Sequence, residues 1–194
     1  MKNMFKMMGV ALLAGAMLFT ACKKDETTST SAAGAPVAEE ITVTFDGSTW
    51  TPNYYTCNYN AETSLIDIQA YKNQNNVPIL NLAFDKKERS YSVTIQSVEQ
   101  TDDQGAYYEI TGYNKENVKA IKYWESADQD TYDWWAQSAT LEVTEFDPTN
   151  MRVSVNVDAL MFDYAGWSGE IRPESSTVTR QMSVRIKNLN LSNK

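Results

Sequence analysis

The chain has 194 residues, with 17 lysines and arginines, 25 aspartates and glutamates, and no histidine. This acidic balance argues against a nucleic-acid partner, because binding nucleic acid requires a basic surface that displaces counterions. The absence of histidine excludes Ser-His-Asp and Cys-His catalytic arrangements, and it excludes zinc sites that depend on imidazole.

Residues 1–21 are predicted to be a lipoprotein signal peptide. Lys2 and Lys6 precede an apolar run over residues 7–19. A basic start followed by about 7–15 apolar residues is typical of secretory signals. A membrane-spanning helix needs about 20 apolar residues, so this run is too short to be one.

Cys22 is predicted to carry the lipid. Phe19-Thr20-Ala21-Cys22 resembles the lipobox of bacterial lipoproteins, in which the cysteine is acylated and becomes the first residue of the mature chain. Two or three acyl chains on one residue would anchor the protein stably to a membrane. The alternative is an ordinary secretory signal with an incidental cysteine.

The residues that follow Cys22 bear on where the protein is anchored. Lys23-Lys24-Asp25-Glu26 resembles the export signal of Bacteroidota lipoproteins. That resemblance implies a lipoprotein of the outer membrane that faces the cell exterior, with a periplasm-facing position as the alternative. Residues 27–38 are small and polar, so residues 22–40 are predicted to be the lipidated cysteine and a flexible tether.

Cys57 is the second cysteine of the chain. If Cys22 carries lipid, Cys57 has no partner for an intramolecular disulfide. It lies in a segment where its neighbours are polar, as in a strand. We therefore expect a small buried side chain, with a reactive thiol or an intermolecular disulfide as the alternative.

Residues 41–194 are predicted to form one β-rich domain, because apolar and polar residues alternate with a period of two along most of its length. The expected strands are 41–45, 48–51, 54–59, 65–71, 77–84, 91–98, 106–111, 139–146, 152–157 with an extension to 162, and 177–191. Residues 116–126 are ambiguous between a strand and a short helix. The predicted fold class is all-β, an antiparallel β-sandwich or barrel of about nine or ten strands.

Three details of this pattern predict local geometry. Asp46-Gly47 is a strong hairpin turn pair, and Asp147-Pro148-Thr149-Asn150 has the chemistry of a β-turn. In the strand before that second turn, strict alternation would place Glu145 inward and Phe146 outward. A β-bulge near the end of the strand would restore Phe146 to the core.

Several segments, in this order, resemble a family of small Bacteroidota lipoproteins built on one β-rich domain of unknown function. They are Phe45-Asp46-Gly47-Ser48-Thr49-Trp50, Tyr132-Asp133-Trp134-Trp135, the hairpin over residues 138–154, and Ile186-Lys187-Asn188-Leu189. The resemblance covers about residues 41–192, and Asn156 and Asp158 depart from it where relatives often carry a glycine. It implies an extracytoplasmic β-domain and no activity, so it supplies no catalytic residues.

Aromatic residues that could bind a ligand are concentrated in the second half of the domain. Sugars lay their C–H faces on aromatic rings, and tyrosine and tryptophan also suit protein interfaces. Filling of the core is the alternative, and of two adjacent tryptophans in a strand one must point inward. The candidate ligand-binding residues are Trp124, Tyr132, Trp134, Trp135 and Trp167.

Residues 128–133 contain three aspartates and could be taken for a calcium loop. They lack the glycine and the late glutamate of an EF-hand, so a solvated loop is expected. No metal site, cofactor or catalytic residue is predicted.

The sequence therefore predicts a non-enzymatic, membrane-anchored lipoprotein with a binding role, in its sharpest form the binding of a polysaccharide. A structural or assembly protein that binds an envelope protein is the second hypothesis. A hydrolase that uses two carboxylates is the third, and it would need a facing pair in a cleft.

Overall fold

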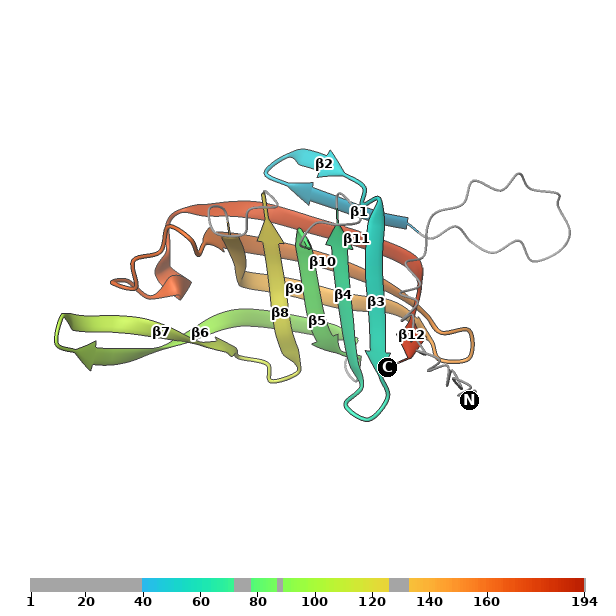
Figure 1. The fold of residues 1–194 in the computed structure, drawn as a ribbon, viewed down its shortest axis with the longest axis horizontal. Helices are drawn as coiled ribbons and strands as arrows, with labels where there is room; N and C mark the ends of the chain where they lie inside the picture. Colours follow the sequence, from blue (N-terminus) through green and yellow to red (C-terminus); the bar gives the residue numbers. More distant parts are fainter. Residues whose placement is uncertain (1–39, 72–77, 87–88, 126–132, 194) are drawn as a thin grey trace, which may run out of the picture.

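The computed structural model describes residues 40–71, 78–86, 89–125 and 133–193, and these are almost entirely β-structure (Figure 1). The predicted signal peptide, Cys22, the tether and Tyr132 lie outside the described residues. The strands are β1 (Glu40–Phe45), β2 (Ser48–Trp50), β3 (Tyr54–Asn60), β4 (Leu65–Tyr71), β5 (Leu80–Asp85), β6 (Ser90–Asp102), β7 (Gly105–Tyr113), β8 (Val118–Trp124), β9 (Asp133–Asp147), β10 (Arg152–Asp163), β11 (Thr179–Asn190) and β12 (Ser192–Asn193). One 3-10 turn, η1 (Pro173–Ser175), precedes β11. No helix among the described residues has the length and apolarity that crossing a membrane requires.

The strands form one sheet that curls into a half-barrel, which confirms the predicted all-β, antiparallel class. Its order is β12-β3-β4-β5-β8-β9-β10-β11-β1-β2, and β6 pairs with both β9 and β7. There are twelve strands in the described residues, more than the nine or ten expected, because the ambiguous residues 116–126 contain β8 and the short β12 follows β11. In Figure 1, β3, β4, β5 and β8 cross in front of β9, β10 and β11.

The short strand β12 shows how far the sheet curls. It follows β11 after a single residue, yet it pairs in parallel with β3 at the opposite end of the strand order. The Ser192 hydroxyl donates to the carbonyl oxygen of Cys57 at 2.9 Å. The curl therefore brings the two ends of the sheet together at one end of the half-barrel.

The core lies inside the curl and is built from the inward residue of each alternating pair. Ile66, Ile68 and Ala70 of β4 are completely buried, while the residues between them are partly exposed. Phe45 of β1 stacks on Tyr123 of β8 with ring centres 4.2 Å apart, which joins the two sides of the core. Cys57 is also buried, as expected of a small apolar side chain.

The predicted bulge in the strand before Asp147 is present. Val155 pairs with Val143, but Ser154 pairs with Glu145, so Thr144 is the extra residue. The bulge returns Phe146 to the inner side, where it packs against the core and edge-on against Tyr59.

Both predicted turns are confirmed. Asp46 and Gly47 have φ values of 48° and 79°, the left-handed pair that a two-residue hairpin requires. In the second turn, the Asp147 carboxylate accepts hydrogen bonds from the backbone N–H groups of Thr149 at 2.9 Å and Asn150 at 3.0 Å.

The ambiguous residues 116–126 contain a strand. Val118, Ile121 and Tyr123 of β8 belong to the core. Their burial against the sheet favours a strand over a short helix. Its alternation is broken by a register shift, since Ala83 of β5 pairs with Ala120 but Phe84 pairs with Val118. Lys119 is thus the extra residue of a β-bulge.

The long strand β9 shares one edge between two partners. Its first residues, 133–135, pair with β8, and residues 138–142 pair with β6. Beyond that contact β6 leaves the sheet and forms a hairpin with β7 that extends away from the half-barrel (Figure 1). Strand pairing along this edge of β9 is therefore interrupted at residues 136–137, between β8 and the hairpin. We call this interruption the split.

A loop between β10 and β11, residues 164–178, packs against this hairpin. The Gly169 carbonyl accepts a hydrogen bond from the backbone N–H of Tyr108 at 2.8 Å. The Glu174 carboxylate accepts from the Ser97 hydroxyl at 2.9 Å. From β9, the Gln137 amide donates to the carbonyl oxygens of the loop residues Pro173 at 2.8 Å and Ser176 at 3.0 Å. These hydrogen bonds thus hold the loop against both the hairpin and β9.

Candidate functional site

A cleft lies between β8 and the β6–β7 hairpin, and we call it the seam cleft. It encloses about 230 Å³. Its walls combine apolar and polar side chains from four strands: Ile95, Ile110, Thr111, Gly112, Tyr113, Lys119, Lys122 and Trp135.

Two β-bulges shape the walls of the seam cleft. On β8 the bulge at Lys119 breaks the alternation, so that Lys119 and Lys122 both line the cleft although strict alternation would place them on opposite faces. On β7 the register shifts between Ile110 and Gly112, which makes Thr111 the extra residue. Gly112 has a φ of 128°, a conformation that favours glycine. Bulges of this kind redirect side chains and are frequent beside binding sites.

Trp135 is held between two side chains at the mouth of the split. The Lys122 ammonium nitrogen is 3.5 Å from the centre of the indole. Tyr164 stacks on the indole with ring centres 4.2 Å apart and planes 14° apart. Groups at these distances would overlap on one face, so they occupy opposite faces. The backbone N–H of Tyr164 donates to the carbonyl oxygen of Asp133 at 2.8 Å, which fixes the position of the tyrosine.

Three polar atoms around Lys122 are buried and make no hydrogen bond of normal geometry to a described residue, although the Trp135 indole N–H interacts with the Asp133 carboxylate. They are Asn81 Oδ1, Asp133 Oδ1 and Trp135 Nε1. Asn81 and Trp135 are the cross-strand neighbours of Lys122 on either side. Asn81 and Asp133 do not line the cleft, so these atoms form a polar layer behind its wall, where ordered water would pair them.

Burial changes the proton affinity of the charged groups beside the cleft. Desolvation lowers the pKa of Lys122, and the nearby Asp133 carboxylate opposes that shift. Desolvation raises the pKa of Asp133, with the Trp135 indole N–H and Lys122 acting in the opposite direction. Burial also raises the pKa of Tyr113, the phenol on the cleft wall, whose hydroxyl donates to the carbonyl oxygen of Ile121 at 3.3 Å.

The cleft carries positive charge on an acidic protein. None of its described lining residues is acidic, whereas two are lysines. Neither Lys119 nor Lys122 has an ion pair within 4.0 Å among the residues that the structure describes. No described carboxylate therefore forms an ion pair with either ammonium group.

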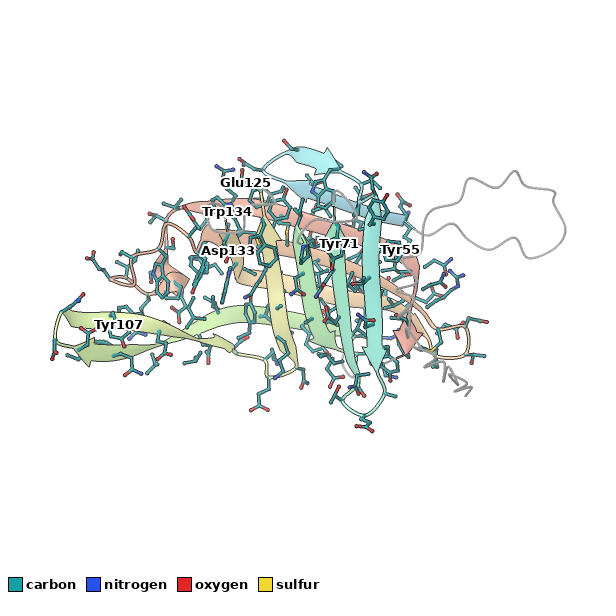
Figure 2. All side chains as sticks on the ribbon, in the orientation of Figure 1. Tyr55, Tyr71, Tyr107, Glu125, Asp133 and Trp134 are labelled. Atoms are coloured by element: carbon teal, nitrogen blue, oxygen red, sulfur yellow. The ribbon has the colours of Figure 1, made fainter. Side chains whose placement is uncertain are left out.

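The aromatic residues that were predicted to bind a ligand lie in different surroundings in the structure. Trp124 is 9% exposed and Trp134 is 3% exposed, so both fill the interior. Figure 2 shows Trp134 close to Glu125 and Asp133 at the end of β8. The Trp134 indole N–H donates to Glu125 at 2.8 Å, and Arg180 donates to the same carboxylate oxygen at 3.0 Å. Tyr132 lies outside the described residues.

Trp135 and Trp167 are brought into one aromatic cluster. It also contains the buried Phe162 and the half-buried Tyr164, and Tyr164 contacts both tryptophans. Trp167 is held in the loop by a hydrogen bond from its indole N–H to the carbonyl oxygen of Ile171 at 2.8 Å. Both faces of Trp135 are covered, so it forms a wall of the cleft through its edge and does not offer an open stacking face.

Sequence reasoning missed Lys119, Lys122 and Thr111. The signal that could have found Lys122 is its place in the segment 116–126, since a strand there would set it on the face opposite Ile121 and Tyr123. Nothing in the sequence marks Lys119 or Thr111, because their positions depend on the two bulges.

Comparisons of the chain with family models, curated proteins and solved structures found no match. The resemblance to a Bacteroidota lipoprotein family therefore stays a prediction from the sequence.

Proposed function

We propose that this protein is a non-enzymatic binding lipoprotein, anchored through Cys22 at the outer face of the outer membrane, and that the seam cleft binds a saccharide. The address rests on the basic start, the apolar run and the position of Cys22 in the sequence. The ligand site rests on the described domain.

The observation that carries the proposal is the mixed lining of the seam cleft. The apolar side chains of Ile95 and Ile110 lie beside the polar side chains of Thr111, Lys119 and Lys122. Small-molecule sites typically combine apolar walls with a few polar groups that fix orientation. A sugar presents both kinds of surface on one ring, since it has apolar C–H faces and a rim of hydroxyl groups.

The volume of the seam cleft suits a small ligand group. Its 230 Å³ lies below the range of about 300–1,000 Å³ that is typical of pockets for drug-sized ligands. The cleft opens at the split in the sheet, so a longer chain would place one unit inside and continue over the surface.

The test is a titration of the mature lipoprotein, held in detergent micelles, with a panel of oligosaccharides while tryptophan emission is recorded. Binding in the cleft changes the surroundings of Trp135, so replacement of Trp135 by Phe should remove the change in emission. Trp124→Phe is the matched control, since Trp124 is buried and does not line the cleft. Binding that is unaffected by changes at Trp135, Lys119 and Lys122 would place the ligand elsewhere.

A second candidate function, binding of an envelope protein, is favoured by apolar side chains exposed on the hairpin and the loop against it. Ile171 is 50% exposed, Val98 is 42% exposed and Tyr107 is 38% exposed; Figure 2 shows Tyr107 out on the hairpin. A Cβ built on Gly169 would lie 3.8 Å from the Cβ of Tyr107, so the loop and the hairpin meet beside this residue. Site-specific crosslinking from Tyr107 in intact cells tests this candidate, and an absence of crosslinked protein would count against it.

The carboxylate-dependent hydrolase receives no support from the seam cleft, whose described lining contains no acid. We do not propose it.

A further inference from the structure

We infer that the seam cleft selects a carboxylated ligand, an acidic sugar of the uronate class, and that Lys119 and Lys122 bind its carboxylate. The inference rests on the proposed saccharide function and adds the chemical class of the sugar. It is carried by the placement and the charge of the two lysines.

The two lysines line the same cleft. They lie three positions apart on β8, and the bulge at Lys119 makes both line the same cleft. A lysine ammonium has three N–H donors and no acceptor. Lys122 rests on the indole of Trp135, which fixes the position of its charge at the wall of the cleft.

The charge of the cleft is opposite to that of the whole chain. The chain has eight more acidic than basic residues. Nevertheless, neither lysine of the cleft has an ion pair with a described residue, and no acid lines the cleft among the described residues.

Burial of Lys122 makes its charge costly without a partner. Lys122 is half-buried and desolvated, which lowers its pKa. Removal of a charge from water is unfavourable unless an opposite charge compensates for it. A ligand carboxylate would supply this compensation, whereas a neutral sugar would leave the ammonium group with the indole and the more distant Asp133.

The apolar walls of the cleft indicate which class of anion it binds. The walls contain Ile95, Ile110 and Tyr113 beside the two lysines, and no arginine lines the cleft among the described residues. Ammonium groups attract carboxylates and phosphates alike, so the walls decide the class of ligand. Apolar side chains beside the two ammonium groups suit a carboxylate on an apolar-faced ring.

The experiment uses the mature lipoprotein in detergent micelles and three probes: an oligogalacturonide, its methyl ester, and succinate. The methyl ester has the same rings but no charge. We expect the acid to bind at least about tenfold more tightly than the ester, a ratio equivalent to about 1.4 kcal/mol. We also expect the affinity for the acid to fall as ionic strength rises, because salt screens charge attraction.

Substitutions then identify the lysines. Lys122→Gln and Lys119→Gln should each weaken binding of the acid more than binding of the ester, and Lys122→Arg should restore the preference. Lys115→Gln is the matched control, because Lys115 is exposed in the turn before β8 and does not line the cleft. Circular dichroism of every variant checks that the fold is kept.

The outcomes separate the two proposals. Equal affinity for acid and ester overturns the carboxylate inference and leaves saccharide binding standing. Binding of succinate that depends on Lys122, without binding of either oligosaccharide, supports the anion site and overturns the saccharide function. A preference for the acid that survives in the Lys119→Gln, Lys122→Gln double variant overturns the assignment of these lysines.

Discussion

Lys122 places its ammonium nitrogen 3.5 Å from the centre of the Trp135 ring. The two residues are cross-strand partners on β8 and β9, at the place where the sheet divides. The contact therefore joins the last pair of strands before the split and forms one corner of the seam cleft.

This contact should stabilise the fold measurably. A cation above an indole contributes about 0.5–1 kcal/mol at exposed sites and about 2 kcal/mol when it is desolvated. In a double-mutant cycle with Lys122→Met and Trp135→Leu, we expect a coupling energy of about 1 kcal/mol in the free energy of unfolding, measured in urea. A coupling energy near zero would show that the lysine and the indole do not interact in solution.

Glu125 is expected to be the most important charged residue for stability at the end of β8. Its carboxylate oxygen accepts hydrogen bonds from the buried Trp134 indole and from Arg180. Glu125→Ala should cost about 1–3 kcal/mol, the penalty of leaving a buried donor without a partner. Glu125→Gln keeps an acceptor and should cost less. Glu116→Ala, at an exposed position, is the control, and an equal loss in both alanine variants would contradict the assignment.

The strands were predictable from the sequence because one face of each is buried, and burial selects a period of two. The bulge at Thr144 could also be inferred, because Phe146 needed to reach the core and strict alternation would have denied it. These are local consequences of apolar patterning, and β4 shows them most simply, with Ile66, Ile68 and Ala70 inward.

The seam cleft could not be predicted, because it depends on relationships between distant parts of the chain. The sharing of the β9 edge between β8 and β6 places Ile95 and Trp135 on one cleft, although they are far apart in sequence. The strand β8 was also not predictable, because the bulge at Lys119 breaks the alternation of apolar and polar residues that would have indicated a strand over residues 116–126. The aromatic residues drew attention for their chemistry, but burial of Trp124 and Trp134 was decided by tertiary packing.

Gln137 is expected to hold the loop over residues 164–178 in place. It is buried on β9 next to the split, and its amide donates to the carbonyl oxygens of Pro173 and Ser176. Gln137→Leu keeps the approximate shape but removes both donors, so we expect a loss of about 1–3 kcal/mol. Amide hydrogen exchange in the loop should become faster. The exposed Gln181→Leu is the control, and unchanged exchange in the Gln137 variant would show that other contacts hold the loop.

Asp147 should make the stability of the β9–β10 hairpin depend on pH. The backbone N–H of Asn150, the Asn150 side chain and the backbone N–H of Thr149 donate to its carboxylate and lower its pKa in the folded protein. Because the folded pKa lies below the unfolded one, the charged form contributes stability that is complete above the unfolded pKa. That contribution is lost as the pH falls through the folded pKa. In Asp147→Asn the side chain does not titrate, so the wild-type protein should be the more stable at neutral pH and the difference should close in strong acid. Urea unfolding of both proteins across this range measures it. A difference that stays constant with pH would mean that the Asp147 charge does not stabilise the turn.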